Sequence, residues 1–286
     1  RPGQAGVPAA DSRWWIAAAA RRPAPAARIT VAAPVTASPP AYTPGREVER
    51  QVFNTLWNCY AFFVNYAILD EFDPSAPAIP VAARAEIDRW ILSNLQLLVR
   101  DARKNFESFN TPGVVRAAED FIEDLSNWYI SRNRRRFWRS RGEDDRDKIA
   151  AYQTLHEVLL TLCKLLAPII PFLTERMYQN LVANPASGGH QPPDQPVGAG
   201  PSPLSVHLCD YPGANTTLID EKLSFQMQVA KRVVSAGHAL RDEAGLRVRQ
   251  PLSELRVVLT DAQERAAVLD FRQLIADELN LKSVQV

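Results

Sequence analysis

The sequence of 286 residues is poor in cysteine and contains no long apolar run. Its three cysteines, Cys59, Cys163 and Cys209, lie far apart and form no CxxC pair, so neither a disulfide framework nor a cysteine zinc site is indicated. The apolar stretch 159–173 is interrupted by Lys164 and by two prolines, so we expect no membrane span. These absences favour a reducing, cytoplasmic setting.

The chain also has almost no net charge and little lysine. Its 33 basic and 32 acidic residues leave a formal charge of +1 at pH 7, so a nucleic-acid-binding surface has to be a local patch. Only 6 of the basic residues are lysines. Because the planar fork of arginine favours bidentate contacts to phosphate, an arginine-rich patch in this chain is more typical of phosphate recognition than of solubility alone.

Residues 1–44 are a mixture of alanine, proline and arginine without sustained periodicity. Repeated prolines remove hydrogen-bond donors of helices and strands alike, so we expect this segment to be irregular or disordered. RNA contact by its arginines, docking through Trp14 and Trp15, and a transit peptide are weaker alternatives. The chain begins with Arg1 instead of methionine, from which we expect a fragment of a longer protein or a processed start.

From residue 46 onward, apolar residues recur at helical spacing. Thr111 followed by Pro112 is a typical helix start, because the hydroxyl can cap free amides and proline at the first helical position loses no hydrogen bond. Pro168 and Pro171 predict that one helix ends and another begins there. The predicted helical stripes cover residues 46–68, 87–102, 111–140, 149–162, 173–181 and 218–243.

The sequence after residue 183 has shorter elements. Gly245 predicts the end of the long helix that starts near Leu218. A loop is predicted over 184–203, where glycine, proline and serine are dense. Three short segments rich in valine or with alternating polarity predict strands, namely SVHL (205–208), LRVVLT (255–260) and KSVQV (282–286).

These elements predict a mainly α fold. An antiparallel helical bundle is expected over residues 45–215, because long amphipathic stripes are joined by short connectors. A long helix and a small α+β appendage are expected over 216–286. Residues 1–44 form no part of either in this prediction.

The segment 127–140, NWYISRNRRRFWRS, packs five arginines and four aromatics into fourteen residues. At 100° per residue, Arg132, Arg136 and Arg139 share one helical face. A solvated face, or pairing of the arginines with the acidic run 143–147, is the bland alternative, but we favour a patch that binds RNA phosphates. Among the aromatics, Tyr129 is expected in the core. Trp138 lies beyond the apolar stripe and is expected to stack on a base or an arginine.

The stretch LSNWYISRNRRRFW resembles the anticodon-binding domain of the isoleucyl-tRNA synthetases, which are class I aminoacyl-tRNA synthetases. The resemblance covers about residues 46–286, and valyl or leucyl relatives are an alternative. Other segments agree in order and spacing, namely LWNCYAFFVNYA, EIDRWILSNL, LLAPIIPFLTERMYQNL, SVHLCDYP, EAGLRVRQPL and IADELNLKSV.

The resemblance implies that this chain binds the anticodon stem-loop of isoleucine tRNA and has no catalytic, cofactor-binding or metal-binding residues of its own. The complete enzyme would use ATP and Mg²⁺ to attach isoleucine to its tRNA, and the catalytic half of the same synthetase would be a partner. A free-standing module that binds RNA or a protein is the competing hypothesis. The residues expected to contact tRNA are Arg132, Arg134, Arg135, Arg136, Trp138, Arg139, Arg247 and Arg249.

The chain departs from the family in what it lacks. Motifs resembling HIGH and KMSKS, the editing domain and a Rossmann-like alternation of strands and helices are not found in the sequence. We therefore expect this chain to be inactive alone.

Other basic, histidine and cysteine residues are interpreted mainly as structural. Arg241 lies near Arg247 and Arg249 and could join them at the RNA, although Arg249 could instead brace the turn before Pro251. His207 and Cys209 would share one side of a strand, but no second pair of zinc ligands has matching spacing. His156 and His238 are interpreted as packing or surface residues.

Overall fold

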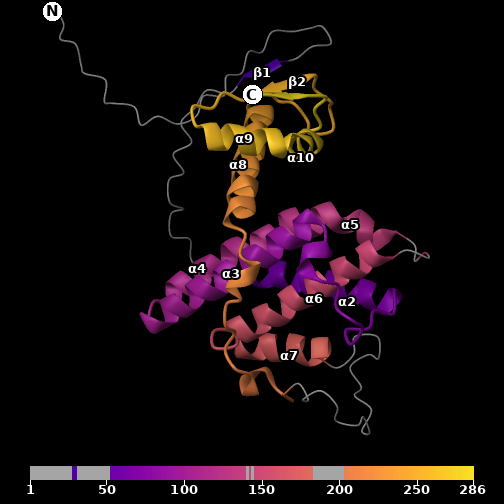
Figure 1. Cartoon of the computed structure of the whole chain (residues 1–286), viewed down its shortest axis with the longest axis vertical. Helices are drawn as coiled ribbons and strands as arrows, with labels where there is room; N and C mark the ends of the chain where they lie inside the picture. The colour runs from indigo at the N-terminus through magenta and orange to yellow at the C-terminus, as the bar shows by residue number, and fades with distance from the viewer. Residues whose placement is uncertain (1–27, 31–51, 140–141, 143–144, 183–202) are drawn as a thin grey trace, which may run out of the picture. The chain divides into compact units, whose positions relative to one another are not determined.

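The computed structural model describes residues 28–30, 52–139, 142, 145–182 and 203–286. The chain divides into two compact units (Figure 1). We call residues 41–220 the helical unit, and residues 221–286 together with the N-terminal residues up to Pro40 the C-terminal unit.

The helical unit is a bundle, in agreement with the predicted fold class. Helix α3 contacts both α4 and α6, and α6 also contacts α2, α5 and α7. Short 3-10 turns, η2 (Val81–Ala83), η5 (Val206–Leu208) and η6 (Thr216–Leu218), lie in the connecting segments. The long elements are α2 (Asn54–Leu69), α3 (Glu86–Glu107), α4 (Thr111–Glu123), the π-helix η3 (Asp124–Ile130), α5 (Ser131–Trp138), α6 (Arg146–Leu166) and α7 (Pro171–Val182).

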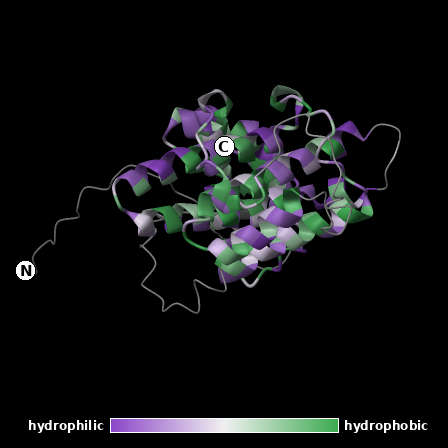
Figure 2. Ribbon diagram, turned by 90° about the horizontal axis from the view of Figure 1, so that it is seen from below, coloured by the Kyte–Doolittle hydropathy of each residue, from purple (hydrophilic) through white to green (hydrophobic). Residues whose placement is uncertain are grey.

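The core is made from one face of each helix. Hydrophobic and hydrophilic residues alternate along the helices, as Figure 2 shows. The predicted stripes of α3 and α6 are buried apart from their first residues, Ile87 and Ile149, which are half-buried. In α4, Val114 and Ala118 are among the buried residues, whereas Val115 is half-buried. In α7, Met177 and Tyr178 are among the buried residues, while Gln179 is exposed.

Polar residues precede both α4 and α6, and the cap of α4 differs in detail from the predicted one. The cap of α4 is Asn110, whose side chain accepts from the amide of Gly113 at 3.2 Å, and Thr111 is the first helical residue. Asp145 does occupy the N-cap position of α6, but its carboxylate accepts from the amide of Gly142 at 2.9 Å and not from an amide of the helix. Both helices nevertheless begin where a short polar side chain precedes the apolar stripe.

A π-helical segment joins α4 to α5 without a break in the helical path. Residues Asp124–Ile130 form i→i+5 hydrogen bonds, which place more residues in each turn than an α-helix does. Side chains beyond the segment are therefore rotated from the positions expected at 100° per residue. The arginines of α5 lie after it, so the side of the bundle that they face cannot be inferred from the apolar stripe of α4.

The segment 205–208 is not a strand, contrary to the prediction. It contains the 3-10 turn η5, and the hydroxyl of Ser205 accepts from the amide of His207 at 3.2 Å. This local bond between side chain and backbone competes with extended structure. The predicted loop 184–203 lies outside the described residues apart from Pro203. The predicted restart at the prolines is confirmed, since α6 ends at Leu166 and α7 starts at Pro171.

The C-terminal unit combines helices with a small parallel sheet, as an α+β appendage should. The strand order is β1-β2-β3, with Ile29 opposite Leu255 and Leu255 opposite Val284. Strand β1 corrects the expectation that residues 1–44 lack regular structure; the rest of that segment lies outside the described residues. The elements are β1 (Arg28–Thr30), α8 (Glu221–Glu243), β2 (Glu254–Arg256), α9 (Ala262–Asp270), α10 (Arg272–Glu278) and β3 (Val284–Gln285).

Helix α8 ends at Glu243, and Gly245 closes it, as predicted. The glycine has a φ of 65°, a left-handed conformation that residues with a Cβ adopt at a cost. Its amide donates to the carbonyl of Asp242, and the next amide, of Leu246, donates to the carbonyl of Arg241, the bond pattern of a Schellman end. In the described part of the chain, no helix combines the length and the apolar character needed to cross a bilayer.

Candidate nucleic-acid interface

Helix α5 presents most of the predicted RNA-binding residues at the surface. Arg134, Arg135 and Arg139 are exposed and Arg132 is half-buried. The indole of Trp138 is 57% exposed, at the last residue of the helix. The helix thus offers basic side chains beside an aromatic surface, the combination that contacts RNA phosphates and unstacked bases.

The buried side of α5 fixes the helix in the bundle. Phe137 is almost fully buried, and its ring packs edge-on against Phe62 and Tyr152 at centroid distances of 5.1 and 4.9 Å. Asn133 is also buried, and its amide donates to the carbonyl of Tyr129 at 2.8 Å. The exposed arginines therefore stand on a rigid base, which lowers the entropic cost of binding.

Arg136 is part of that base and differs from the other arginines of the cluster. Its Nη1 and Nη2 donate to the two carboxylate oxygens of Asp88 at 2.9 and 2.8 Å, and Nη2 lies 2.8 Å from a carboxylate oxygen of Asp147. Asp88 is completely buried and also accepts from the hydroxyl of Tyr129 at 2.7 Å. The guanidinium thus joins α5 to the first turns of α3 and α6.

The pKa values of this network show how strongly it is coupled. Burial alone lowers the pKa of Arg136, but the hydrogen bond and charge of Asp88 outweigh burial and raise it above its ordinary value. Burial and the neighbouring charge of Asp88 raise the pKa of Tyr129 well above its usual range. Asp88 is thus a common cause of both shifts.

This geometry corrects the place predicted for Arg136. It was expected on an exposed face with Arg132 and Arg139, whereas only 15% of its side chain is exposed and two carboxylates hold it. The alternative that the arginines pair with the acidic run is thus realised for Arg136, and in part for Arg139, which lies 3.7 Å from Asp147. The geometry supports a contact with RNA for the exposed arginines, and a role within the fold for Arg136.

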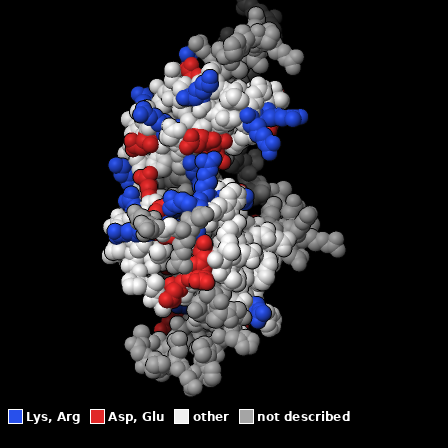
Figure 3. Space-filling model, turned by 90° about the vertical axis from the view of Figure 1, so that its right-hand side faces the viewer, with Lys and Arg blue, Asp and Glu red and all other residues white. Residues whose placement is uncertain are grey.

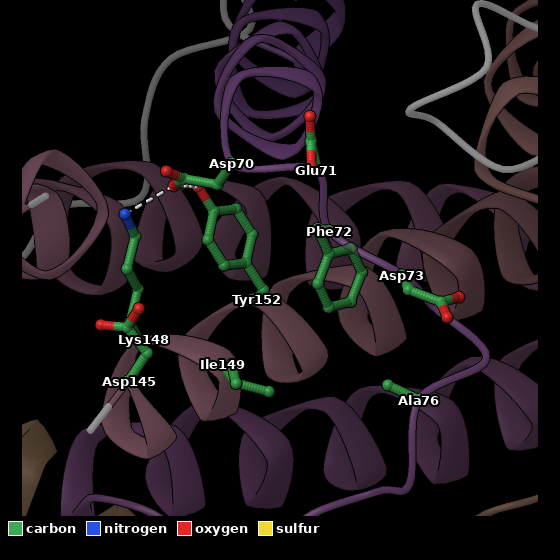
Figure 4. A pocket seen from close by; sticks show the side chains of 9 residues that line it. All are labelled: Asp70, Glu71, Phe72, Asp73, Ala76, Asp145, Lys148, Ile149 and Tyr152. Atoms are coloured by element: carbon green, nitrogen blue, oxygen red, sulfur yellow. Dashed lines mark hydrogen bonds and ion pairs between the residues drawn. The ribbon is translucent and has the colours of Figure 1, made fainter. Parts of the chain in front are cut away.

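A second polar network holds the C-terminal end of α5. Lys148 is buried, and its Nζ donates to the carbonyl of Arg139, at the end of the helix, at 2.6 Å. The same Nζ lies 2.6 Å from a carboxylate oxygen of Asp70. Figure 4 shows Lys148 and Tyr152, from consecutive turns of α6, both directed at Asp70. A cation at a helix C-terminus stabilises the free carbonyls there, so Lys148 fixes the position of Arg139.

The second predicted basic group lies in the C-terminal unit, on the turn after α8. Arg247 and Arg249 are exposed there. Arg241 is buried, and its guanidinium donates to the carbonyls of Arg247, Gln250 and Leu279. Its suggested place at the RNA is therefore wrong: it braces the turn that displays the other two arginines. Burial lowers its pKa.

The cysteine side chains and His156 pack within the fold. The Sγ of Cys209 lies 3.2 Å from the hydroxyl of Tyr178, and burial raises the pKa of Cys59 and Cys163 to about 12, which keeps both as unreactive thiols. His156 is largely buried against aromatic rings, and burial lowers its pKa. Within the described ranges, no group of three or more His, Cys, Asp or Glu side chains is placed to hold a metal ion.

Charges of both signs are interspersed on the molecular surface. On the face drawn in Figure 3, blue Lys and Arg side chains lie between red Asp and Glu side chains. This distribution agrees with the net charge of +1 and means that no long-range field of one sign is expected. Recognition of an anion has to come from short-range contacts in local groups such as the exposed residues of α5.

Comparisons with known proteins agree with an RNA-binding surface. The family described as the anticodon-binding domain of tRNA ligase matches residues 88–259, a range that begins at the buried partner of Arg136. Isoleucine–tRNA ligases of Dehalococcoides mccartyi and Thermus thermophilus are 45% and 42% identical over 241 and 242 residues, each match covering 84% of this chain and 22% of the relative. The chain thus spans about a fifth of the length of these curated relatives, in their C-terminal part. The family match extends over more than half of the sequence, and the chain belongs to the anticodon-binding domains of tRNA ligases.

Proposed function

We propose that this chain is the part of an isoleucine–tRNA ligase that binds the anticodon stem-loop of isoleucine tRNA. The observation that carries the proposal is the surface of α5, where Arg134, Arg135, Arg139 and the indole of Trp138 are exposed on a helix fixed from below. The arginines contact backbone phosphates and set the orientation of the RNA. Trp138 stacks on an unpaired base, the usual route to sequence discrimination in single-stranded RNA.

The identity of the tRNA and of the catalytic partner is part of the same proposal. It is supported by the names of the relatives, which are isoleucine–tRNA ligases. The catalytic half of the synthetase is the proposed partner in the cytoplasm, where the three free thiols of the described residues stay reduced. In that complete enzyme, ATP and Mg²⁺ are held by the catalytic half and serve to activate isoleucine.

Competition between tRNAs tests the proposed specificity. The whole chain is expected to prefer isoleucine tRNA over a tRNA with a different anticodon loop, and Trp138→Ala is expected to reduce that preference. Loss of one base stack costs about 1–3 kcal/mol, roughly a fivefold to hundredfold loss of affinity for the cognate RNA alone. The measurement is competition of unlabelled tRNAs against a labelled isoleucine anticodon stem-loop.

Trp57→Ala is the matched control, because Trp57 is also exposed, at 43%, but lies on α2. Equal preference of the wild-type chain for all tRNAs would leave a non-specific RNA-binding module as the function. Equal effects of the two tryptophan variants would remove Trp138 from the recognition of the loop.

The chain alone is expected to form no aminoacyl-adenylate. Adenylate formation requires groups that hold the triphosphate in line with the amino-acid carboxylate and stabilise charge on the reacting phosphorus. The sequence contains no glycine-rich strand-to-helix turn that would cradle these phosphates. Isoleucine-dependent exchange of pyrophosphate into ATP by the purified chain measures this. Exchange above background that follows the protein through purification would contradict the proposal that activation belongs to the rest of the synthetase.

A further inference from the structure

A polar cavity of about 360 Å³ lies beside α5, at the N-terminal ends of α3 and α6. Three arginines line it, Arg84, Arg139 and Arg146, together with Asp147. Only Arg139 belongs to the cluster noted in the sequence. Since a water molecule occupies about 30 Å³ of liquid, the space is large enough for a phosphate group with several waters.

Arg84 is held rigidly in the wall of this cavity. Its Nε donates to the carbonyl of Ile79 at 3.0 Å, and its Nη1 donates to the hydroxyl of Thr154 at 2.9 Å. These two acceptors are uncharged; the nearest carboxylate in an ion pair with it is that of Glu157, at 3.5 Å. A guanidinium fixed in this way loses little side-chain entropy when it binds an anion.

Arg146 occupies a position that helix stability does not explain. It is the first residue of α6 and is exposed, so its charge lies at the positive end of the helix dipole, where a basic side chain is unfavourable. The start of α3 is similar, because its N-cap is Ala85, and among the described residues neither helix is capped by the side chain of its N-cap residue. Both helix ends thus add free amides to the positive potential of the cavity.

Among the described residues that line the cavity, basic side chains outnumber carboxylates. Asp147 is bound by Arg136 at 2.8 Å, and Arg139 lies 3.7 Å away from it. Glu157 pairs with Arg84 at 3.5 Å and does not itself line the cavity. Three arginines therefore face a single lining carboxylate, which is already paired with a fourth arginine outside the cavity.

We propose that this cavity is a phosphate-binding subsite, in which Arg84, Arg139 and Arg146 hold one phosphate of the tRNA backbone. The inference rests on the proposed tRNA-binding function and adds two residues to it, Arg84 and Arg146. Because Arg139 belongs both to the exposed surface of α5 and to the cavity, the bound phosphate is the one next to the segment of RNA that lies along α5.

Replacement of single phosphates in the RNA tests the subsite. A set of isoleucine anticodon stem-loops, each with one phosphate replaced by a neutral methylphosphonate, is bound to the whole chain and to Arg146→Gln. For the wild-type chain, one replacement next to the α5-bound segment is expected to weaken binding about tenfold, the worth of one charge-assisted contact. In Arg146→Gln the same replacement is expected to have little further effect, while the other positions keep theirs.

Arg103→Gln is the matched control. Arg103 is an exposed arginine with its nearest carboxylate in an ion pair at 3.5 Å, from Glu107, and it lies on α3 about 27 Å from Ala85 at 1.5 Å per residue. In Arg103→Gln, the phosphates whose replacement weakens binding should be the same as in the wild-type chain. A pattern that is also unchanged in Arg146→Gln overturns the subsite even if the chain binds RNA as proposed.

Inorganic phosphate separates the subsite from the proposed function. If the wild-type chain does not bind the stem-loop, the proposed function fails, and the thermal midpoint in phosphate is compared with that in chloride at equal ionic strength. If the thermal midpoint is higher in phosphate than in chloride for the wild-type chain and Arg103→Gln, but not for Arg146→Gln, the cavity binds an anion. The phosphate that it binds then does not come from this RNA. If phosphate and chloride give the same thermal midpoint in each of the three proteins, the cavity is not an anion site.

Discussion

Replacing Asp88 with alanine is expected to lower the free energy of unfolding by about 3–4 kcal/mol. The carboxylate is completely buried, and it accepts from both terminal nitrogens of Arg136 and from the hydroxyl of Tyr129. Without it, a guanidinium that is only 15% exposed loses its closest counter-charge, and a buried hydroxyl loses its shortest hydrogen bond. Urea unfolding followed by circular dichroism measures the loss.

Asp101→Ala is the matched control for this prediction. Asp101 also lies on α3 and pairs with Arg100 at 3.0 Å, but both side chains are about half exposed. An exposed pair of this kind contributes about 0–1 kcal/mol. The double variant Asp88→Leu with Arg136→Met removes both buried charges and is expected to recover part of the stability. If Asp88→Ala costs no more than Asp101→Ala, the ion pair does not hold α5 in place.

The bundle could be predicted from the sequence because its information is local. The spacing of apolar residues in 87–102 and 149–162 is a property of each segment alone, and burial of α3 and α6 confirms it. The left-handed Gly245 and the proline restart after α6 are local signals as well. These features need no knowledge of which helix lies beside which.

The position of Arg136 could not be predicted in the same way, for two reasons. The π-helical segment 124–130 rotates the residues that follow it, and no residue pattern considered for the sequence indicated it. The main partner of Arg136, Asp88, lies 48 residues away in the chain. One signal was present: Asp88 precedes Ile91 and Leu95 on the apolar stripe of α3. A charge on a buried face requires a buried partner, and Arg136 is that partner.

The short segments were the least predictable, because tertiary and side-chain bonds decide them. The alternation of polar and apolar residues in 205–208 predicts a strand that includes His207. In the structure the hydroxyl of Ser205 accepts from the amide of His207, which favours a 3-10 turn. Arg241 precedes the two exposed arginines of the turn, yet three backbone carbonyls surround its guanidinium. Two of these carbonyls, of Arg247 and Gln250, belong to the turn itself, and the third, of Leu279, lies 38 residues away. Backbone acceptors of this kind leave no trace in the pattern of side chains.

The salt dependence of tRNA binding should change most when the exposed arginines of α5 are removed together. Each phosphate contact contributes about 0.7–0.9 to the slope of log affinity against log salt, so Arg134→Gln, Arg135→Gln and Arg139→Gln combined should reduce its magnitude by about 2–3. The corresponding loss of affinity at low salt is on the order of a hundredfold or more. Salt titration of binding to the isoleucine anticodon stem-loop measures both quantities.

Three arginines on the other helices provide the control for charge itself. Arg100, Arg103 and Arg116 are exposed on α3 and α4, and their triple replacement by glutamine lowers the net charge by the same amount. Its slope should stay near that of the wild-type chain, because a change in total charge is screened beyond a Debye length of about 10 Å at 0.1 M salt. Equal slopes for the two triple variants would mean that α5 carries no phosphate contacts. Because Arg136 is unchanged in both variants, the ion pair with Asp88 remains, and neither result can be attributed to loss of that pair.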